Sequence, residues 1–288
     1  MRRIFQLSVA CLAAGALSAC STPSEVTNVP IPPTAGVRFI NAVPDTAGSY
    51  GLDFRFIDLV ESNAQFRIAF RNSPATSAGV TASTAIEYKA ARAGQRHFRV
   101  FLSDSLGSVA STVLKDSTLT LEAGKNYTVV LWGFARTGST PAMKLSVIEE
   151  SVADPGTNVA LRVLNTTASP IDVREYASTG TVPTAPTWAG VPAMSASSYV
   201  TAAPGQFKYN VQPAGGGTPL FADALALIGV PGTIDIEALP GTTVAGSAVT
   251  LIVFPRSVAG SKTPQTSAFQ VPAASFMWDR RPPITGKQ

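Results

Sequence analysis

Val37-Arg38-Phe39-Ile40-Asn41-Ala42-Val43-Pro44 opens the folded part of this chain of 288 residues. Its pattern is an apolar residue, an arginine, two apolar residues and an asparagine. The same pattern returns more than a hundred residues later as Leu161-Arg162-Val163-Leu164-Asn165. Chance could supply one such match, so the pattern by itself does not establish a repeat.

Three more pairs of matching stretches follow in the same order. They are Leu52-Asp53-Phe54 with Ile171-Asp172-Val173, Tyr88-Lys89-Ala90-Ala91-Arg92-Ala93-Gly94-Gln95 with Tyr199-Val200-Thr201-Ala202-Ala203-Pro204-Gly205-Gln206, and Ala123-Gly124-Lys125-Asn126-Tyr127-Thr128-Val129-Val130 with Ala245-Gly246-Ser247-Ala248-Val249-Thr250-Leu251-Ile252. Four ordered matches predict a tandem duplication. We expect domains at 36–150 and 157–272, separated by the turn-forming Asp154-Pro155-Gly156-Thr157, and a tail at 273–288.

The sequence predicts an all-β fold. Apolar and polar residues alternate along Leu52-Asp53-Phe54-Arg55-Phe56, and Asn126 to Phe134 is a longer apolar run that fits a central buried strand. Residues 82–93 are rich in helix formers, but the second copy carries Pro204 where the first has Ala93. Proline favours an extended residue before it, so we expect a strand and turn in both copies, with Gly94 and Gly205 at equivalent turns.

The N-terminus reads as a secretory signal. Arg2 and Arg3 precede an apolar run that ends in Leu17-Ser18-Ala19-Cys20. This arrangement resembles a bacterial lipoprotein signal, which implies removal of residues 1–19 and lipidation of Cys20. The apolar run is shorter than the roughly 20 residues a spanning helix needs. Residues 20–35, with four prolines, predict a lipidated cysteine on an extended tether. By resemblance to lipoprotein sorting in Gram-negative bacteria, Ser21 in place of Asp favours the outer membrane if the host is Gram-negative.

A second resemblance rests on Val37-Arg38-Phe39-Ile40-Asn41-Ala42-Val43-Pro44-Asp45, Leu52-Asp53-Phe54, and Leu121-Glu122-Ala123-Gly124-Lys125-Asn126-Tyr127-Thr128-Val129-Val130. In this order the three stretches resemble the family called domain of unknown function 4397, which occurs in secreted and surface-anchored bacterial proteins. The resemblance implies an immunoglobulin-like β-sandwich for each copy and implies no activity.

Residues that carry chemistry are few. His97 is the single histidine, which excludes a His-based triad, and the polar side of its strand predicts a surface position. Lipidation of Cys20 would leave the mature chain without a thiol, because Cys11 lies in the removed peptide. Glu149, Glu150 and Asp154 lack calcium-loop spacing, and we expect a solvated strand end. The sequence therefore predicts no catalytic residue, cofactor or metal site.

The balance of basic and acidic residues limits the classes of partner that the chain can bind. Without Arg2 and Arg3 the chain has 20 basic and 18 acidic residues. No basic cluster remains for nucleic acid. We expect a non-catalytic envelope module that binds protein or glycan, or serves in envelope structure. The alternative is a glycan-directed envelope hydrolase whose carboxylates converge only in the fold.

The candidate binding loop is residues 177–196. Three prolines stiffen it, and it carries Trp188 and Met194 among small polar residues. A stiff loop with an aromatic anchor loses little entropy on binding, so we expect Trp188 to be at least half exposed. In the alternative, Trp188 folds back and closes its own sandwich. Trp132 lies in an apolar run and is expected in the core.

Overall fold

The computed structural model describes residues 30–46, 51–59, 67–71, 86–258 and 267–283. These residues are mostly in strands, which confirms the all-β prediction; the short helix α2 (Gly107–Ala110) and a 3-10 turn, η3 (Ser267–Phe269), are the helical elements described. The signal segment and Cys20 lie outside the described residues, so their predicted roles stay predictions.

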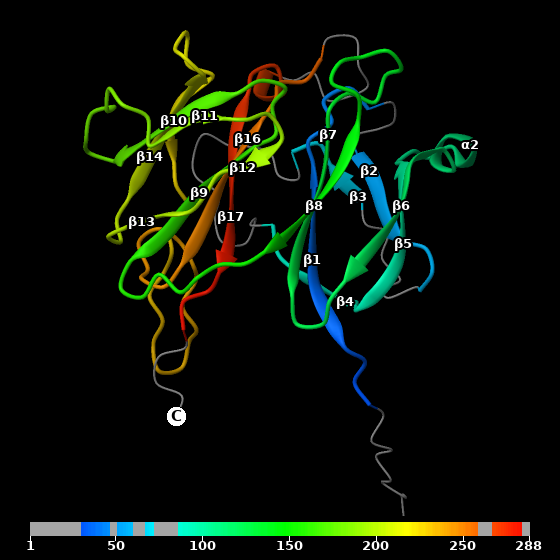
Figure 1. The fold of residues 1–288 in the computed structure, drawn as a ribbon, viewed down its shortest axis with the longest axis horizontal. Coiled ribbons are helices and arrows are strands. Elements are labelled where there is room, and N and C mark those ends of the chain that lie inside the picture. The colour runs from blue at the N-terminus through cyan, green and yellow to red at the C-terminus, as the bar shows by residue number, and fades with distance from the viewer. Residues whose placement is uncertain (1–29, 47–50, 60–66, 72–85, 259–266, 284–288) are drawn as a thin grey trace, which may run out of the picture. The chain divides into compact units, whose positions relative to one another are not determined.

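The first half of the chain forms two four-stranded sheets (Figure 1). One sheet has the order β4-β1-β7-β8 and the other β3-β2-β5-β6. The strands are β1 (Thr34–Asn41), β2 (Gly51–Phe56), β3 (Arg67–Ala69), β4 (Lys89–Arg92), β5 (Gly94–Leu102), β6 (Val113–Leu121), β7 (Asn126–Trp132) and β8 (Lys144–Glu150). All these pairs are antiparallel except β1 with β7, which is parallel.

The second half repeats this pairing. Its sheets have the orders β12-β9-β16-β17, with β13 also on β9, and β11-β10-β14-β15, and β9 pairs with β16 in parallel. The strands are β9 (Val159–Asn165), β10 (Ile171–Ala177), β11 (Trp188–Val191), β12 (Ser195–Ala196), β13 (Val200–Ala202), β14 (Phe207–Pro213), β15 (Phe221–Leu225), β16 (Ala248–Phe254) and β17 (Ala273–Arg280). Each strand of the first half therefore has a counterpart in the second.

Strand β4 shows that the described part of residues 82–93 is extended and not helical. Residues 89–92 are a strand paired with β1, as the proline in the second copy predicts, and residues 82–85 lie outside the described part. Gly94 opens β5 directly after the turn that follows β4, and Gly205 lies in the connection between β13 and β14. Only Gly94 has a left-handed backbone, with φ +114°.

The C-terminal stretch differs from the prediction. Residues 273–280, predicted as part of a tail, form β17, which pairs with β16 along its length and is the counterpart of β8. Phe276 and Met277 face opposite sides of this strand and both are buried. The prediction failed because Asp279 and its charged neighbours look like a solvated end, whereas Asp279 is buried against arginines.

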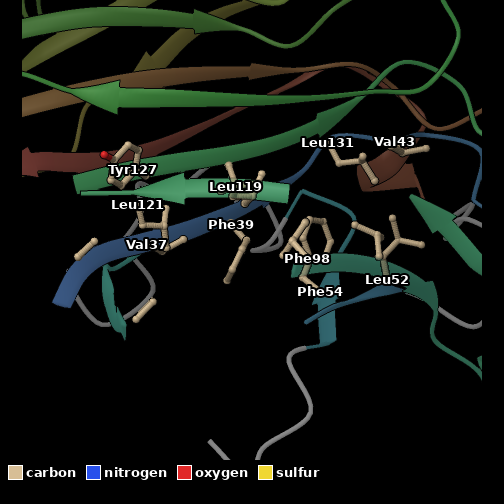
Figure 2. Close-up of a cluster of buried hydrophobic side chains, with 14 of the residues drawn as sticks. Val37, Phe39, Val43, Leu52, Phe54, Phe98, Leu119, Leu121, Tyr127 and Leu131 are labelled. Atoms are coloured by element: carbon tan, nitrogen blue, oxygen red, sulfur yellow. The ribbon is translucent and has the colours of Figure 1, made fainter. Parts of the chain in front are cut away.

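The core of the first half lies between its two sheets. Figure 2 shows the side chains that meet there from β1, β2, β5, β6 and β7. Phe39 stacks on Phe98 with ring centroids 5.5 Å apart and also meets Phe54 at 5.5 Å. In the second half a matching cluster includes Trp188, Tyr209 and Phe276. Each half is thus a sandwich with its own apolar core.

A third apolar cluster joins the halves. It comprises Ile40, Ala42, Val130, Trp132, Leu164, Ile252, Phe254 and Met277. These side chains lie on the faces of β1, β7, β9, β16 and β17 that point away from the two sandwich cores. The central strands are consequently buried on both faces, which accounts for their near-continuous apolar sequences and confirms the core position of Trp132. Residues 33–288 form one compact unit.

The predicted tether ends two residues early. Residues 30–33 are exposed and form no strand, whereas Thr34 and Ala35 already belong to β1 and pair with β4. The physical reason is Ala35, whose small side chain is buried in the first core.

Gly133, directly after β7, provides a test of the close packing at the end of that strand. It has φ +82°, and a Cβ atom there would lie 2.5 Å from the carbonyl oxygen of Ala142. Gly138 has nearly the same φ, +81°, but open space around it. Gly138→Ala should destabilise by roughly 1–2 kcal/mol from backbone strain alone. Gly133→Ala should lose a further ~1–3 kcal/mol from the clash, measured by urea unfolding. Equal losses would contradict the close approach.

Candidate functional site

The most elaborate polar cluster described lies in the seam between the halves. We call it the seam network; it comprises Arg38, Tyr88, Thr128, Glu150, Arg162, Tyr199, Thr250 and Asp279. Arg38 extends from β1 and is 1 % exposed. Its Nε donates to Thr128 Oγ1 on β7 at 2.8 Å, and its Nη1 donates to the Trp278 carbonyl at 2.8 Å. The guanidinium also lies over the Tyr88 ring, 4.3 Å from its centre.

Arg162 repeats this arrangement in the second half. It extends from β9, the counterpart of β1, and its Nε donates to Thr250 Oγ1 on β16 at 2.7 Å. Its guanidinium lies 4.7 Å from the centre of the Tyr199 ring. The repeated arginine of the sequence therefore has the same partners, a threonine and a tyrosine, in both halves.

Two carboxylates cross the seam. Glu150, at the end of β8, accepts from Arg38 at 3.2 Å and from Arg162 at 2.7 Å. Asp279, near the end of β17, accepts from Arg162 at 3.3 Å and makes a short contact with Arg38. Thr128 donates to Glu150, and Thr250 donates to Asp279. Each carboxylate thus binds the arginines of both halves, and the two cations balance the two anions.

The pKa values follow from this pairing. Burial alone raises the pKa of the Asp279 carboxyl, but Arg38 and Arg162 outweigh it and hold the pKa below its usual value. For Arg38 and Arg162, burial lowers the pKa, and the carboxylates more than reverse this. Burial raises the pKa of Tyr88 and Tyr199 above that of a free tyrosine. These directions keep Arg38 and Arg162 charged beside the ionised Asp279 carboxylate.

A second arginine contact joins the halves at the far end of the seam. Arg71 follows β3 in the first half and is 1 % exposed. Its guanidinium donates to the carbonyls of Pro255, Ala268, Phe269 and Val271, all in the second half. Burial lowers the pKa of Arg71 to about 10.

Trp188 and Met194 do not form an exposed binding surface. Trp188 begins β11, is 6 % exposed and packs in the core of the second half, with Nε1 donating to the Ser198 carbonyl at 3.2 Å. The prediction of a half-exposed Trp188 is wrong, because the indole closes its own sandwich. Met194 is partly buried and packs against the cluster between the halves.

Of the remaining predicted surface residues, some are exposed and one is buried. His97 lies at the surface, as predicted, with Nε2 2.5 Å from Asp116. Glu149 is exposed beside Lys125 at 2.8 Å. Glu150 was predicted to be solvated with it, and this is wrong, because the strand alternation directs Glu150 into the seam.

Glu175 was not predicted as a site residue. It lies on β10, and the Tyr209 hydroxyl donates to its carboxylate at 3.4 Å. Burial raises the pKa of Glu175 to about 7. It is the one carboxyl of the described residues for which a raised pKa is resolved. In glycoside hydrolysis a carboxyl of this kind acts as the general acid beside a second carboxylate, and the hydrogen-bond partner of Glu175 is the Tyr209 hydroxyl.

Sequence reasoning did not predict the seam network. The signal for Arg38 and Arg162 was present, since an arginine inside an apolar strand in both copies requires a buried partner. Glu150 and Asp279 carried no comparable signal. They lie at strand ends, among other charged residues, and only the packing of the two halves brings them to the arginines.

Asp279→Asn tests the seam network. The change leaves two buried guanidinium groups with one buried carboxylate, so we expect a loss of about 3–5 kcal/mol in the free energy of unfolding. Asp154→Asn is the matched control, because Asp154 is exposed and pairs with Arg280 at 2.8 Å. That change should lower the free energy of unfolding by about 0–1 kcal/mol. Unfolding by guanidinium chloride measures both variants. Similar small losses for both variants would argue against a tightly coupled network.

Glu175 gives a pH test. Its carboxyl has a pKa of about 7 in the folded protein against 4.5 for the ordinary group. Between these values the unfolded chain binds fewer protons than the folded one, so stability falls as pH rises through this window. Glu175→Gln should remove this fall, which amounts to at most about 3 kcal/mol. Thermal unfolding of both proteins from pH 4 to 8 measures it, and parallel curves would contradict the raised pKa.

Comparison with known proteins points to one family. A family model described as a domain of unknown function (DUF4397) matches residues 35–174. No curated protein matches the chain. The matched region contains the whole first sandwich and extends through β9 into β10. Over these residues the chain resembles the DUF4397 family, whose description names no activity.

Proposed function

We propose that the protein is a non-catalytic, lipid-anchored component of a bacterial cell envelope. In this proposal Cys20 carries the lipid and residues 33–288 form a two-sandwich module that binds protein or glycan or serves in envelope structure. The outer membrane is the favoured location, because Ser21 follows the cysteine.

The non-catalytic proposal rests on one observation: the buried charged groups of the seam network bind one another. Arg38, Arg162, Glu150 and Asp279 bind one another and hold the two halves in one unit. A catalytic carboxylate needs access to a substrate and a pKa near the working pH. Asp279 has neither, since it is buried and its pKa is lowered.

Among the residues that the structure describes, no helix is long and apolar enough to cross a membrane. The support for the lipid comes from the Leu17-Ser18-Ala19-Cys20 motif. Stable attachment to a membrane needs more than one acyl chain. The resemblance to a bacterial lipoprotein implies two or three acyl chains on Cys20.

Cys20→Ser, in the full-length chain expressed in a Gram-negative host, tests the anchor. We expect loss of labelled palmitate from the protein, because the acceptor thiol is gone. Cys11→Ser is the matched control and should keep the label, since that cysteine lies in the removed peptide. Phase partition in detergent and membrane fractionation provide a second measurement. Equal palmitate labelling of the wild type and Cys20→Ser would overturn the proposal.

A further inference from the structure

The largest group of exposed apolar side chains on one described segment lies between β15 and β16. Ile234 and Ile236 are 75 % and 67 % exposed, and Val230 is 55 % exposed. We call these three residues the apolar tip. Single exposed apolar residues are ordinary at protein surfaces, but three on one short loop mark a contact site.

The apolar tip has a defined backbone. Val230 and Leu239 exchange two backbone hydrogen bonds, at 3.0 and 2.9 Å. The Thr233 N–H donates to the Ile236 carbonyl at 2.8 Å, and the Thr233 hydroxyl accepts from the Ile236 N–H at 3.2 Å. The hairpin base is tight, since a Cβ at Gly241 would come within 2.0 Å of the Gly229 nitrogen. These contacts hold the isoleucines away from the core.

The tip lies at the end of the sandwiches where β1 begins. Below it, Gly246 donates to the Asn158 carbonyl, and β16 starts beside the start of β9. Strand β1 runs in the same direction, because Arg38 near its start meets Asp279 beside the start of β16. At the opposite end, Val258 after β16 donates to the carbonyl of Pro44 after β1.

The lipid proposed above would be attached close to this end. Thirteen residues separate Cys20 from Thr34, where β1 begins. A chain of this length spans at most about 45 Å when fully extended. The tether therefore enters the folded module at the end that carries the start of β1, which leaves this end free to lie against the bilayer.

From this placement, and on the basis of the proposed lipid anchor, we propose that the apolar tip inserts into the interface of the membrane that holds Cys20. The occupant is an uncharged or zwitterionic lipid surface. Asp235 lies between the two isoleucines and Glu237 follows them, and Arg281 lies 3.8 Å from Glu237, so the tip offers no excess of positive charge to anionic lipids. Insertion would therefore depend on apolar burial and respond little to salt.

A probe on the tip tests this. Ile234→Cys is made in the full-length lipidated protein, whose mature chain has no other free thiol, and is labelled with a polarity-sensitive fluorophore. Val271→Cys is the matched control, since its side chain is 55 % exposed and its backbone binds Arg71 at the opposite end. In zwitterionic phosphatidylcholine vesicles the probe at 234 should shift to the blue and brighten several-fold, and the probe at 271 should not.

The outcomes separate the two proposals. If the labelled proteins do not float with the vesicles, the lipid anchor fails and the tip inference fails with it. Flotation with a water-like signal at 234 keeps the anchor and overturns the tip inference. A blue shift in detergent that grows with protein concentration, and is unchanged by vesicles, means that a second copy covers the tip, which also overturns it. A blue shift confined to anionic vesicles would overturn the choice of lipid.

Discussion

Two buried guanidinium groups balanced by two buried carboxylates are the constraint on which the arrangement of this protein depends. Each half contributes one arginine and one carboxylate to this network. Arg38 takes a carboxylate from each half, and so does Arg162. Removing a charge from water costs several kcal/mol, and the pairing offsets that cost only when all four groups are in place. We infer that the network acts mainly through specificity, because it allows the halves to pack in one register.

The apolar cluster between the halves supplies the free energy that the charges do not. Ile40, Val130, Leu164 and Ile252 extend from the central strands and remove apolar surface from water. An apolar surface by itself tolerates sliding, since one aliphatic contact resembles another. The charged groups on one side of this cluster and Arg71 on the other bind fixed partners. Together these polar contacts fix the register in which the two halves pack.

The fold was largely predictable and the seam was not. Alternation at Leu52–Phe56 and the long run from Asn126 are local signals, and both positions are strands in the structure. The strand at Lys89 followed from comparing Ala93 with Pro204. The failures at Trp188, Glu150 and Asp279 share one cause. Whether an indole or a carboxylate at a strand end faces water depends on what packs over it, and that partner lies up to 241 residues away in the chain.

The position of Asp279 has a consequence for synthesis. Ribosomes deliver β1 and Arg38 near the beginning of the folded region and β17 at its end. Until β17 arrives, a nascent or truncated chain carries two arginines with Glu150 as their one seam carboxylate, beside an apolar face that lacks Met277. Such a surface is what chaperones and proteases recognise in unfinished proteins. A chain that ends before Ala273 therefore lacks both the second carboxylate of the seam network and one strand of the apolar cluster between the halves.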